Sequence, residues 1–170
     1  MHNSSKADRP VLNVTRSSEM IFLDVLAIAG IVAGLILVFA NWQTLPDKIP
    51  AHFDFSGKVT SYSSKNTLWI LSGSSIFSFF MFRILVRYPH IFNYLVAITR
   101  ENAAIQYRLA ITMMYWLLTE MVWIFTLIQG QIILAAKAPN PTLHPLLVLF
   151  PVVVIVGTIG NYLWKSFQSR

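Results

Sequence analysis

The chain has 170 residues, of which 55% are hydrophobic and only 12% are charged. A soluble domain of this length usually carries about 25% charged residues and could not bury so much apolar surface, so we expect an integral membrane protein. Cysteine is absent, which excludes disulfides, zinc–thiolate sites, iron–sulfur clusters and cysteine nucleophiles. The net charge of +6 comes from basic residues scattered between apolar runs, so we expect lipid headgroups rather than nucleic acid beside them.

The polar N-terminal tail, residues 1–19, follows no signal-peptide pattern, and the apolar run 20–40 is long enough to span a membrane. We expect this run to be a retained anchor. Ala27, Gly30 and Gly34 share one face of it, in the small-residue spacing typical of close helix contacts. We expect that face to pack inside the bundle rather than to form a dimer, although a homo-oligomer stays open. Gly157, Gly160 and Asn161 are expected to serve the same purpose in the last span.

Residues 41–66 form a dense polar insert that contains the stretch "LPDKIPAHFDFSGKVTSYSSK". Pro46 and Pro50 stiffen its entry and forbid a helix between them. The segment "AHFDF" alternates polar and apolar residues, Ser56-Gly57 is typical of a tight turn, and "KVTSY" is typical of a returning strand. The pattern predicts a short β-hairpin whose phenylalanines, Phe53 and Phe55, press onto the bundle.

The hairpin should leave His52, Asp54 and Lys58 near the surface. Lys65 falls at the N-terminal end of the next helix, where a cation opposes the helix dipole, so it needs a partner. Asp47 or Asp54 could supply the negative charge. Ser63 or Ser64 is the expected cap of that helix.

Three further spans are predicted at residues 67–86, 109–134 and 146–164, joined by connections at 87–108 and 135–145. Thr99 is a plausible N-cap for a helix that projects several turns from the membrane before the third span. Pro151 should kink the last span. The predicted fold is therefore all-α: one domain, residues 1–170, built as a four-helix membrane bundle with a hairpin-like loop between the first two helices.

Lysine and arginine place nine positive charges in the two tails and the 87–108 connection with its edges, against four in the other two loops. The positive-inside rule then puts both termini in the cytoplasm and residues 41–66 and 135–145 outside.

Three ionisable residues fall inside the spans. Asp24 and Arg83 lie at similar depth, and they either pair or reach the interface separately. Glu120 falls near the middle of the third span, where a charge is costly. It is either a proton-carrying or ligand-binding acid or a protonated acid that donates a hydrogen bond between helices. The expected partners are the threonine and tryptophan side chains beside it: Thr112, Trp116, Thr119 and Trp123.

The outer loop offers little catalytic chemistry. His52 and Asp54 together with His144 make only a weak metal-ligand pattern, and no nucleophile motif appears, so we expect no metal, cofactor or catalytic residue. The hypothesised ligand-binding residues are Asp47, His52, Asp54, Lys58 and Lys65. The hypothesised structural residues are Pro46, Ile49, Pro50, Phe53, Gly57 and Ser64. The plainer alternative is a structural plug held by a Lys–Asp bridge.

The same loop resembles the signature of the SdpI-type bacterial membrane proteins, in which Pro-x-x-Ile-Pro-x-His is followed by an aromatic residue, Asn or Asp, Gly, and a terminal Ser-Lys. The stretch "RYPHIFNYLVAITRENAAIQYRLA" is similar to the short, four-span branch of that family. The chain departs from the signature at Thr60, Ser61 and Tyr62. The resemblance implies a protein of the bacterial cell membrane, related to immunity proteins that protect a cell from a secreted toxic peptide.

Two interpretations follow, besides that of an accessory subunit of a membrane complex. In the first, a non-enzymatic membrane protein recognises an extracellular or periplasmic ligand, such as a peptide or a membrane-protein partner, through its outer loop. In the second, a small membrane enzyme or transporter uses His52, Asp54, Lys65 and Glu120.

Overall fold

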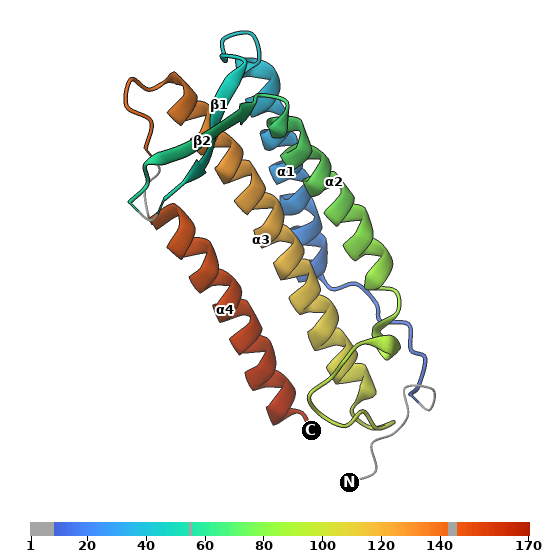
Figure 1. Cartoon of the computed structure of the whole chain (residues 1–170). Helices are drawn as coiled ribbons and strands as arrows, with labels where there is room; N and C mark the ends of the chain where they lie inside the picture. Colours follow the sequence, from blue (N-terminus) through green and yellow to red (C-terminus); the bar gives the residue numbers. More distant parts are fainter. Residues whose placement is uncertain (1–8, 55, 143–145) are drawn as a thin grey trace.

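The computed structural model describes residues 9–54, 56–142 and 146–170, without the side chains of 146–148. It contains four long helices: α1 (Ser18–Asn41), α2 (Thr67–Leu85), α3 (Ala103–Lys137) and α4 (Leu146–Gln168) (Figure 1). Each is long and apolar enough to cross a membrane. Strands β1 (Lys48–Phe53) and β2 (Val59–Ser64) form one antiparallel hairpin between α1 and α2, and a short 3₁₀ helix, η2 (Pro89–Ile91), follows α2. The predicted fold class is confirmed.

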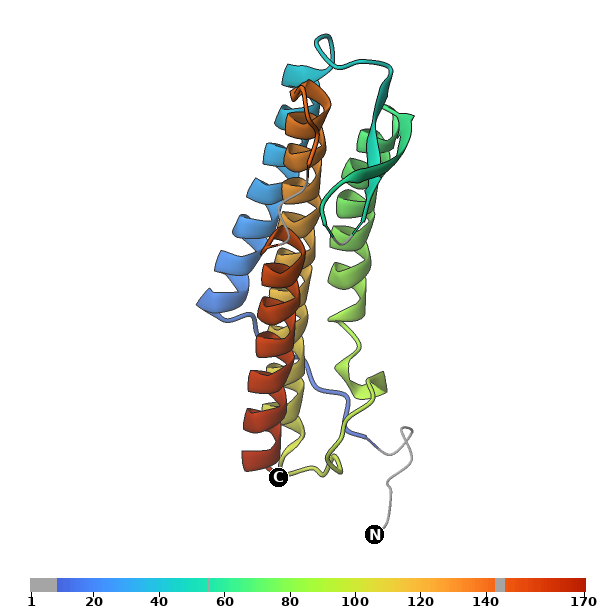
Figure 2. The ribbon, with the colours of Figure 1, turned by 60° about the vertical axis from the view of Figure 1, so that its left-hand side comes forward.

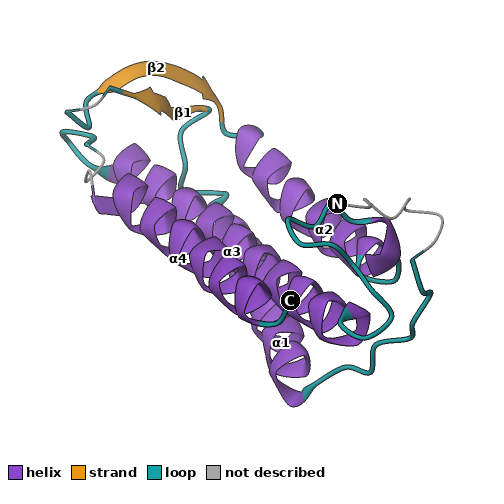
Figure 3. Cartoon of the chain, turned by 90° about the horizontal axis from the view of Figure 1, so that it is seen from below, coloured by secondary structure: helices purple, strands orange, loops and turns teal. Residues whose placement is uncertain are grey.

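Helix α3 is the centre of the bundle, since it contacts α1, α2 and α4. Helix α4 runs alongside α3, as the turned view in Figure 2 also shows. The strands lie together at one end of the molecule (Figure 3), which we call the hairpin end. The described part of the N-terminal tail and the C-terminus lie at the opposite end, the terminal end (Figure 1).

The helix boundaries lie close to the predicted spans, with one correction. Ser17 caps α1 by accepting a hydrogen bond from the Met20 N–H. Thr99 does not cap α3, because its hydroxyl accepts from the Asn102 N–H and closes a turn before the helix begins at Ala103. With 35 residues, α3 is about 52 Å long, so it extends beyond the predicted span at both ends. Helix α4 continues through Pro151 to Gln168.

The small residues of α1 allow α3 to approach closely, as predicted. A Cβ atom on Gly30 would lie 2.8 Å from Val122 Cγ1, and one on Gly34 would lie 2.6 Å from Gln129 Oε1. Ala27 is fully buried in the same interface. The corresponding expectation for α4 is wrong as regards packing inside the bundle, because Gly157, Gly160 and Asn161 are exposed and, within the described part of the chain, a Cβ built on either glycine would meet no atom within 4 Å beyond its own helix backbone.

The polar stripe of α3 faces the backbone of α1. The Thr119 and Thr126 hydroxyls donate to the carbonyls of Leu23 and Gly30 at 3.1 and 2.9 Å, and Trp123 Nε1 donates to a third α1 carbonyl. Such bonds satisfy the threonine and indole donors inside a bilayer, where water cannot do so.

Candidate functional site

The hairpin is bent rather than regular. Lys48 pairs with Ser64 and Phe53 pairs with Val59, but the register shifts on both sides of His52. A proline contributes no N–H to the ladder, which is consistent with an irregularity directly after Pro50. His52 is nevertheless exposed and Phe53 is half-buried. At these two positions the structure therefore agrees with the prediction that the histidine lies near the surface and the phenylalanine faces the bundle. Phe55 lies outside the described residues.

The hairpin turn is held by Asp54. Its Oδ1 accepts hydrogen bonds from the Ser56 N–H, the Ser56 hydroxyl and the Lys58 N–H, at 2.8, 2.6 and 3.0 Å. The Ser56 hydroxyl and the Lys58 N–H hold the pKa of the Asp54 carboxyl below its ordinary value, so it stays ionised. Gly57 has a φ of 81°, a conformation that residues with a side chain rarely adopt, which explains a glycine here.

The base of the hairpin is anchored in the bundle. Ile49 is completely buried in a cluster with Val38, Leu45, Leu68 and Ile133, and Pro50 beside it is also buried. Pro46 is exposed on the entry segment. The cluster joins the base of the hairpin to α1, α2 and α3.

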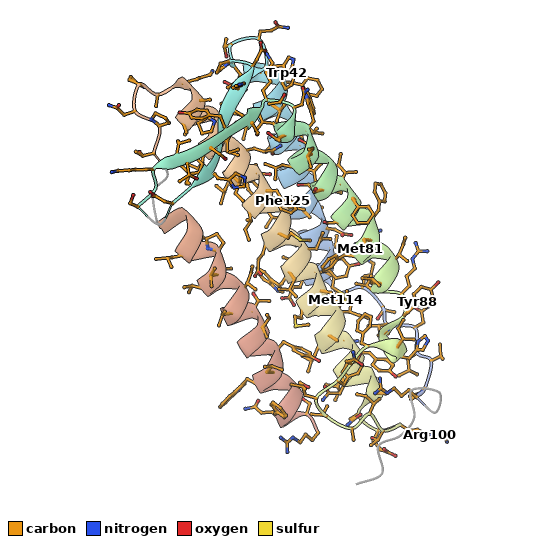
Figure 4. All side chains as sticks on the ribbon, viewed as in Figure 1. Trp42, Met81, Tyr88, Arg100, Met114 and Phe125 are labelled. Carbon is orange, nitrogen blue, oxygen red and sulfur yellow. The ribbon has the colours of Figure 1, made fainter. Side chains whose placement is uncertain are left out.

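Lys65 closes the loop at its base. Its Nζ lies 3.2 Å from Asp47 Oδ1, 3.4 Å from the Leu45 carbonyl and 5.1 Å from the centre of the Trp42 ring. Trp42 is labelled at the hairpin end in Figure 4. Of the two predicted partners, Asp47 is the observed one. The Lys65 side chain is only 21% exposed, whereas that of Asp47 is 96% exposed, so Asp47 is the member of this pair that a ligand can reach.

The predicted serine cap of α2 takes a different form. Ser64 Oγ accepts from the Asn66 N–H at 3.3 Å, and Ser63 Oγ lies 3.1 Å from Thr67 Oγ1. Asn66 is the N-cap residue, and its side chain makes no capping bond. The serines therefore shape the turn that leads into α2.

His52, Asp54 and Lys58 are exposed at the hairpin tip, and so is Ser56. Lys58 also forms an isolated β-bridge with Thr142, so the tip lies against the connection between α3 and α4. His144, the remaining member of the weak metal pattern, lies outside the described residues. Among those that are described, no cluster of histidine and carboxylate side chains could hold a metal ion.

An apolar groove lies beside the tip. A cavity of about 410 Å³ is lined by Ala51 and Phe53 of β1 and by side chains of α3 and α4. A second cavity, of about 210 Å³, continues it deeper between α3 and α4, since both are lined by Ile124, Leu127 and Pro151. Glu120 lines the deeper cavity.

Glu120 is bound by α4 rather than by its own helix. The Thr158 hydroxyl donates to Glu120 Oε1, while Oε2 is buried and has no hydrogen-bond partner among the described residues. The expectation that neighbouring threonine and tryptophan side chains satisfy Glu120 is wrong for Thr119 and Trp123, because both are bound to α1, and for Trp116, which donates to Glu19.

Asp24 and Arg83 form an ion pair, which confirms the first of the two predicted alternatives, pairing, over separate contacts with the membrane interface. Arg16, which the sequence pattern did not single out, binds the same oxygen, Asp24 Oδ2. Asp24 is only 7% exposed. The cluster ties the N-terminal tail, α1 and α2 together at the terminal end.

Two buried glutamines, Gln106 and Gln129, were not identified from the sequence, and their side chains bind other helices. Gln129 Nε2 donates to the Leu68 carbonyl and to Ser72 Oγ of α2, and Gln106 Nε2 donates to the Ser166 and Ser169 carbonyls near the end of α4. The available signal was their polarity within a mostly apolar segment, because a side-chain amide in such a place requires partners. The predicted polar residues thus fall into separate places: the hairpin tip, the Lys65–Asp47 pair, Glu120 with Thr158, and Asp24 with its arginines.

Comparison with known proteins yields one family. The model of a domain of unknown function, DUF1648, matches residues 29–75, from the middle of α1 through the hairpin to the first half of α2. No curated protein matches the chain. No solved structure matches it either.

Proposed function

We propose that this chain is a non-enzymatic protein of the bacterial cell membrane, with both termini in the cytoplasm, whose outward hairpin recognises an amphipathic peptide. The activity would resemble that of immunity proteins, which protect a cell from a secreted toxic peptide. The observation that carries the proposal is the position of a fixed, exposed polar tip beside an apolar groove.

The tip suits recognition because hydrogen bonds within the turn already hold its shape. Asp54 holds the turn through three hydrogen bonds, and Ile49 anchors the base in the bundle. His52 and Lys58 project from this framework. A preorganised site loses less conformational entropy on binding, so a few polar contacts can supply useful affinity.

The groove supplies the apolar half of the site. Phe53 and the facing surfaces of α3 and α4 enclose a cavity whose size falls within the range of small-ligand pockets, about 300–1,000 Å³. A peptide that places apolar side chains in this groove would present its polar groups to His52 and Lys58 at the hairpin tip.

The alternative, an enzyme or transporter that uses His52, Asp54, Lys65 and Glu120, requires these side chains at one place. Lys65 is engaged with Asp47, Asp54 with its own turn, and Glu120 with Thr158. The geometry therefore favours binding over catalysis.

Photo-crosslinking tests the proposal directly. A photoreactive amino acid is placed at His52 in the full chain, and cells that produce it are exposed to the secreted peptides of the source bacterium. We expect a peptide adduct at His52 and none when the same group is placed at Arg108, an exposed residue of α3 far along the chain from the hairpin.

Survival of the exposed cells provides the second measurement. Wild-type chain should protect, and His52→Ala should lose protection while keeping its unfolding temperature. Gly57→Val should lose both, because valine is strained at a φ of 81°. Equal killing with and without the chain, or equal adducts at His52 and Arg108, would refute peptide recognition.

A further inference from the structure

The terminal end contains a cavity of about 510 Å³ that plays no part in the proposed peptide site. It lies between the N-terminal tail, α1, the end of α2 and α3, and two of its lining residues, Arg87 and Pro89, flank Tyr88, which is labelled in Figure 4. Three arginines line it: Arg16, Arg83 and Arg87.

The cavity wall carries unbalanced positive charge. Arg16 and Arg83 share a single carboxylate, that of Asp24. Arg87 is exposed and, in the part of the chain that the structure describes, has no carboxylate partner. Glu19, the acid nearest Arg16 in the sequence, does not line the cavity and accepts a hydrogen bond from Trp116. Guanidinium groups in such excess are suited to phosphate, which they can bind through paired hydrogen bonds.

The rest of the wall is largely apolar. The cavity is lined by Val11, Leu12 and Val14 of the tail, by Val86 directly after α2, and by the buried side chains of Met20 in α1 and Ile111 in α3. A free phosphate ion would gain nothing from these side chains, whereas an acyl chain would bury apolar surface against the exposed Val11 and Leu12. The cavity also lies at the ends of membrane-spanning helices, where lipid headgroups are found.

We infer that this cavity binds an anionic phospholipid from the leaflet at the terminal end, with its phosphate facing Arg83 and Arg87 and its acyl chains along Val11 and Leu12. The bound lipid would join the N-terminal tail to the ends of α1 and α2, because all three contribute to the wall. The ligand differs from the proposed peptide in chemistry and in location, so either assignment can fail without the other.

Native mass spectrometry of the full chain tests the inference. The protein is purified in mild detergent with equal amounts of phosphatidylglycerol and phosphatidylcholine, and the retained lipids are counted. We expect wild type to retain phosphatidylglycerol preferentially. Arg87→Gln should weaken that retention about fivefold, which corresponds to about 1 kcal/mol for one basic residue near the headgroups. Arg87→Lys should keep most of it.

Two further variants separate a site from general surface charge. Arg108→Gln removes an exposed arginine of α3 that does not line the cavity, and it should leave retention unchanged. Leu12→Glu places a negative charge in the cavity wall and should abolish the preference, without disturbing folding because Leu12 is exposed.

Three results would overturn the inference. The first is equal retention of the two lipids by wild type, and the second is equal loss in Arg87→Gln and Arg108→Gln. The third is full displacement of phosphatidylglycerol by millimolar inorganic phosphate, which would assign the arginines to a small anion instead of a lipid.

Discussion

Lys65 lies at the N-terminal end of α2, where its positive charge opposes the helix dipole. Its contacts with Asp47, the Leu45 carbonyl and the Trp42 ring compensate for that position and fix the base of the hairpin. These contacts favour a structural role for Lys65 over the hypothesised ligand-binding role, which stays a prediction, and Asp47 is the exposed member of the pair.

Lys65→Gln should lower the free energy of unfolding by about 1 kcal/mol, because it removes a cation–π contact and a partly screened ion pair. Thermal unfolding in detergent measures this change. The control is Lys58→Gln at the exposed tip, for which we expect a change within about 0.5 kcal/mol. Equal effects of the two substitutions would restore Lys65 to the ligand-binding set.

The role of Glu120 can be tested with two substitutions: Gln keeps the shape of the side chain but cannot ionise, and Ala removes the side chain beyond Cβ. Glu120→Gln should preserve stability, since the amide oxygen can still accept from the Thr158 hydroxyl. Glu120→Ala should cost about 1–3 kcal/mol, because it leaves that hydroxyl without a partner in the interior. Unfolding measurements distinguish the two variants. If Gln destroys protection as completely as Ala does while stability is intact, Glu120 carries a proton or a ligand and is not merely packing.

At the scale of elements, the contact between α1 and α3 depends on glycine, and α2 offers a matched control. Gly34→Ala places a Cβ atom 2.6 Å from Gln129 Oε1. Gln129 cannot easily move away, because its Nε2 is bound to the Leu68 carbonyl and to Ser72. We expect a loss of about 1–3 kcal/mol, as for overpacking elsewhere.

Gly73→Ala in α2 meets nothing within 4 Å, so it should be neutral or stabilise the chain by up to about 1 kcal/mol through helix propensity. Unfolding temperatures of both variants check the comparison. A Gly34→Ala protein as stable as Gly73→Ala would show that α1 and α3 do not need this close approach.

At the scale of the whole molecule, the two ends have different chemistry. The hairpin end carries a fixed polar tip beside an apolar groove, and the terminal end carries a cavity lined by arginines. Helix α3 joins them, with Gln129 bound to α2 and Gln106 bound to the end of α4. A ligand at either end would therefore contact elements that pack on the same central helix.

The orientation of this arrangement is tested by labelling. The chain has no cysteine, so single cysteines can replace Lys58 and Arg170 without a background signal. An impermeant thiol reagent added to intact cells should label the cysteine at 58 and leave that at 170 protected until the cells are opened. The reverse pattern would place the hairpin in the cytoplasm and would remove the basis for recognition of a secreted peptide.

The sequence alone determined the features that depend on local chemistry. Apolar runs of membrane length predicted all four helices, and the prolines and Gly57 predicted the hairpin, because span length and turn geometry are properties of consecutive residues. The spacing of Gly30 and Gly34 predicted a close helix contact for the same reason.

Only the tertiary structure decided which residue lies opposite which. In the structure, the Thr158 hydroxyl donates a hydrogen bond to Glu120, and Arg16 joins the predicted ion pair of Asp24 and Arg83. Lys65 pairs with Asp47 and not with Asp54. Gly157 and Gly160 are exposed. Each of these outcomes depends on how a helix is rotated or on how a tail or loop is placed against its neighbours. The periodicity of a single segment indicates which side chains share a face, but the element that covers that face is set by the packing of the bundle.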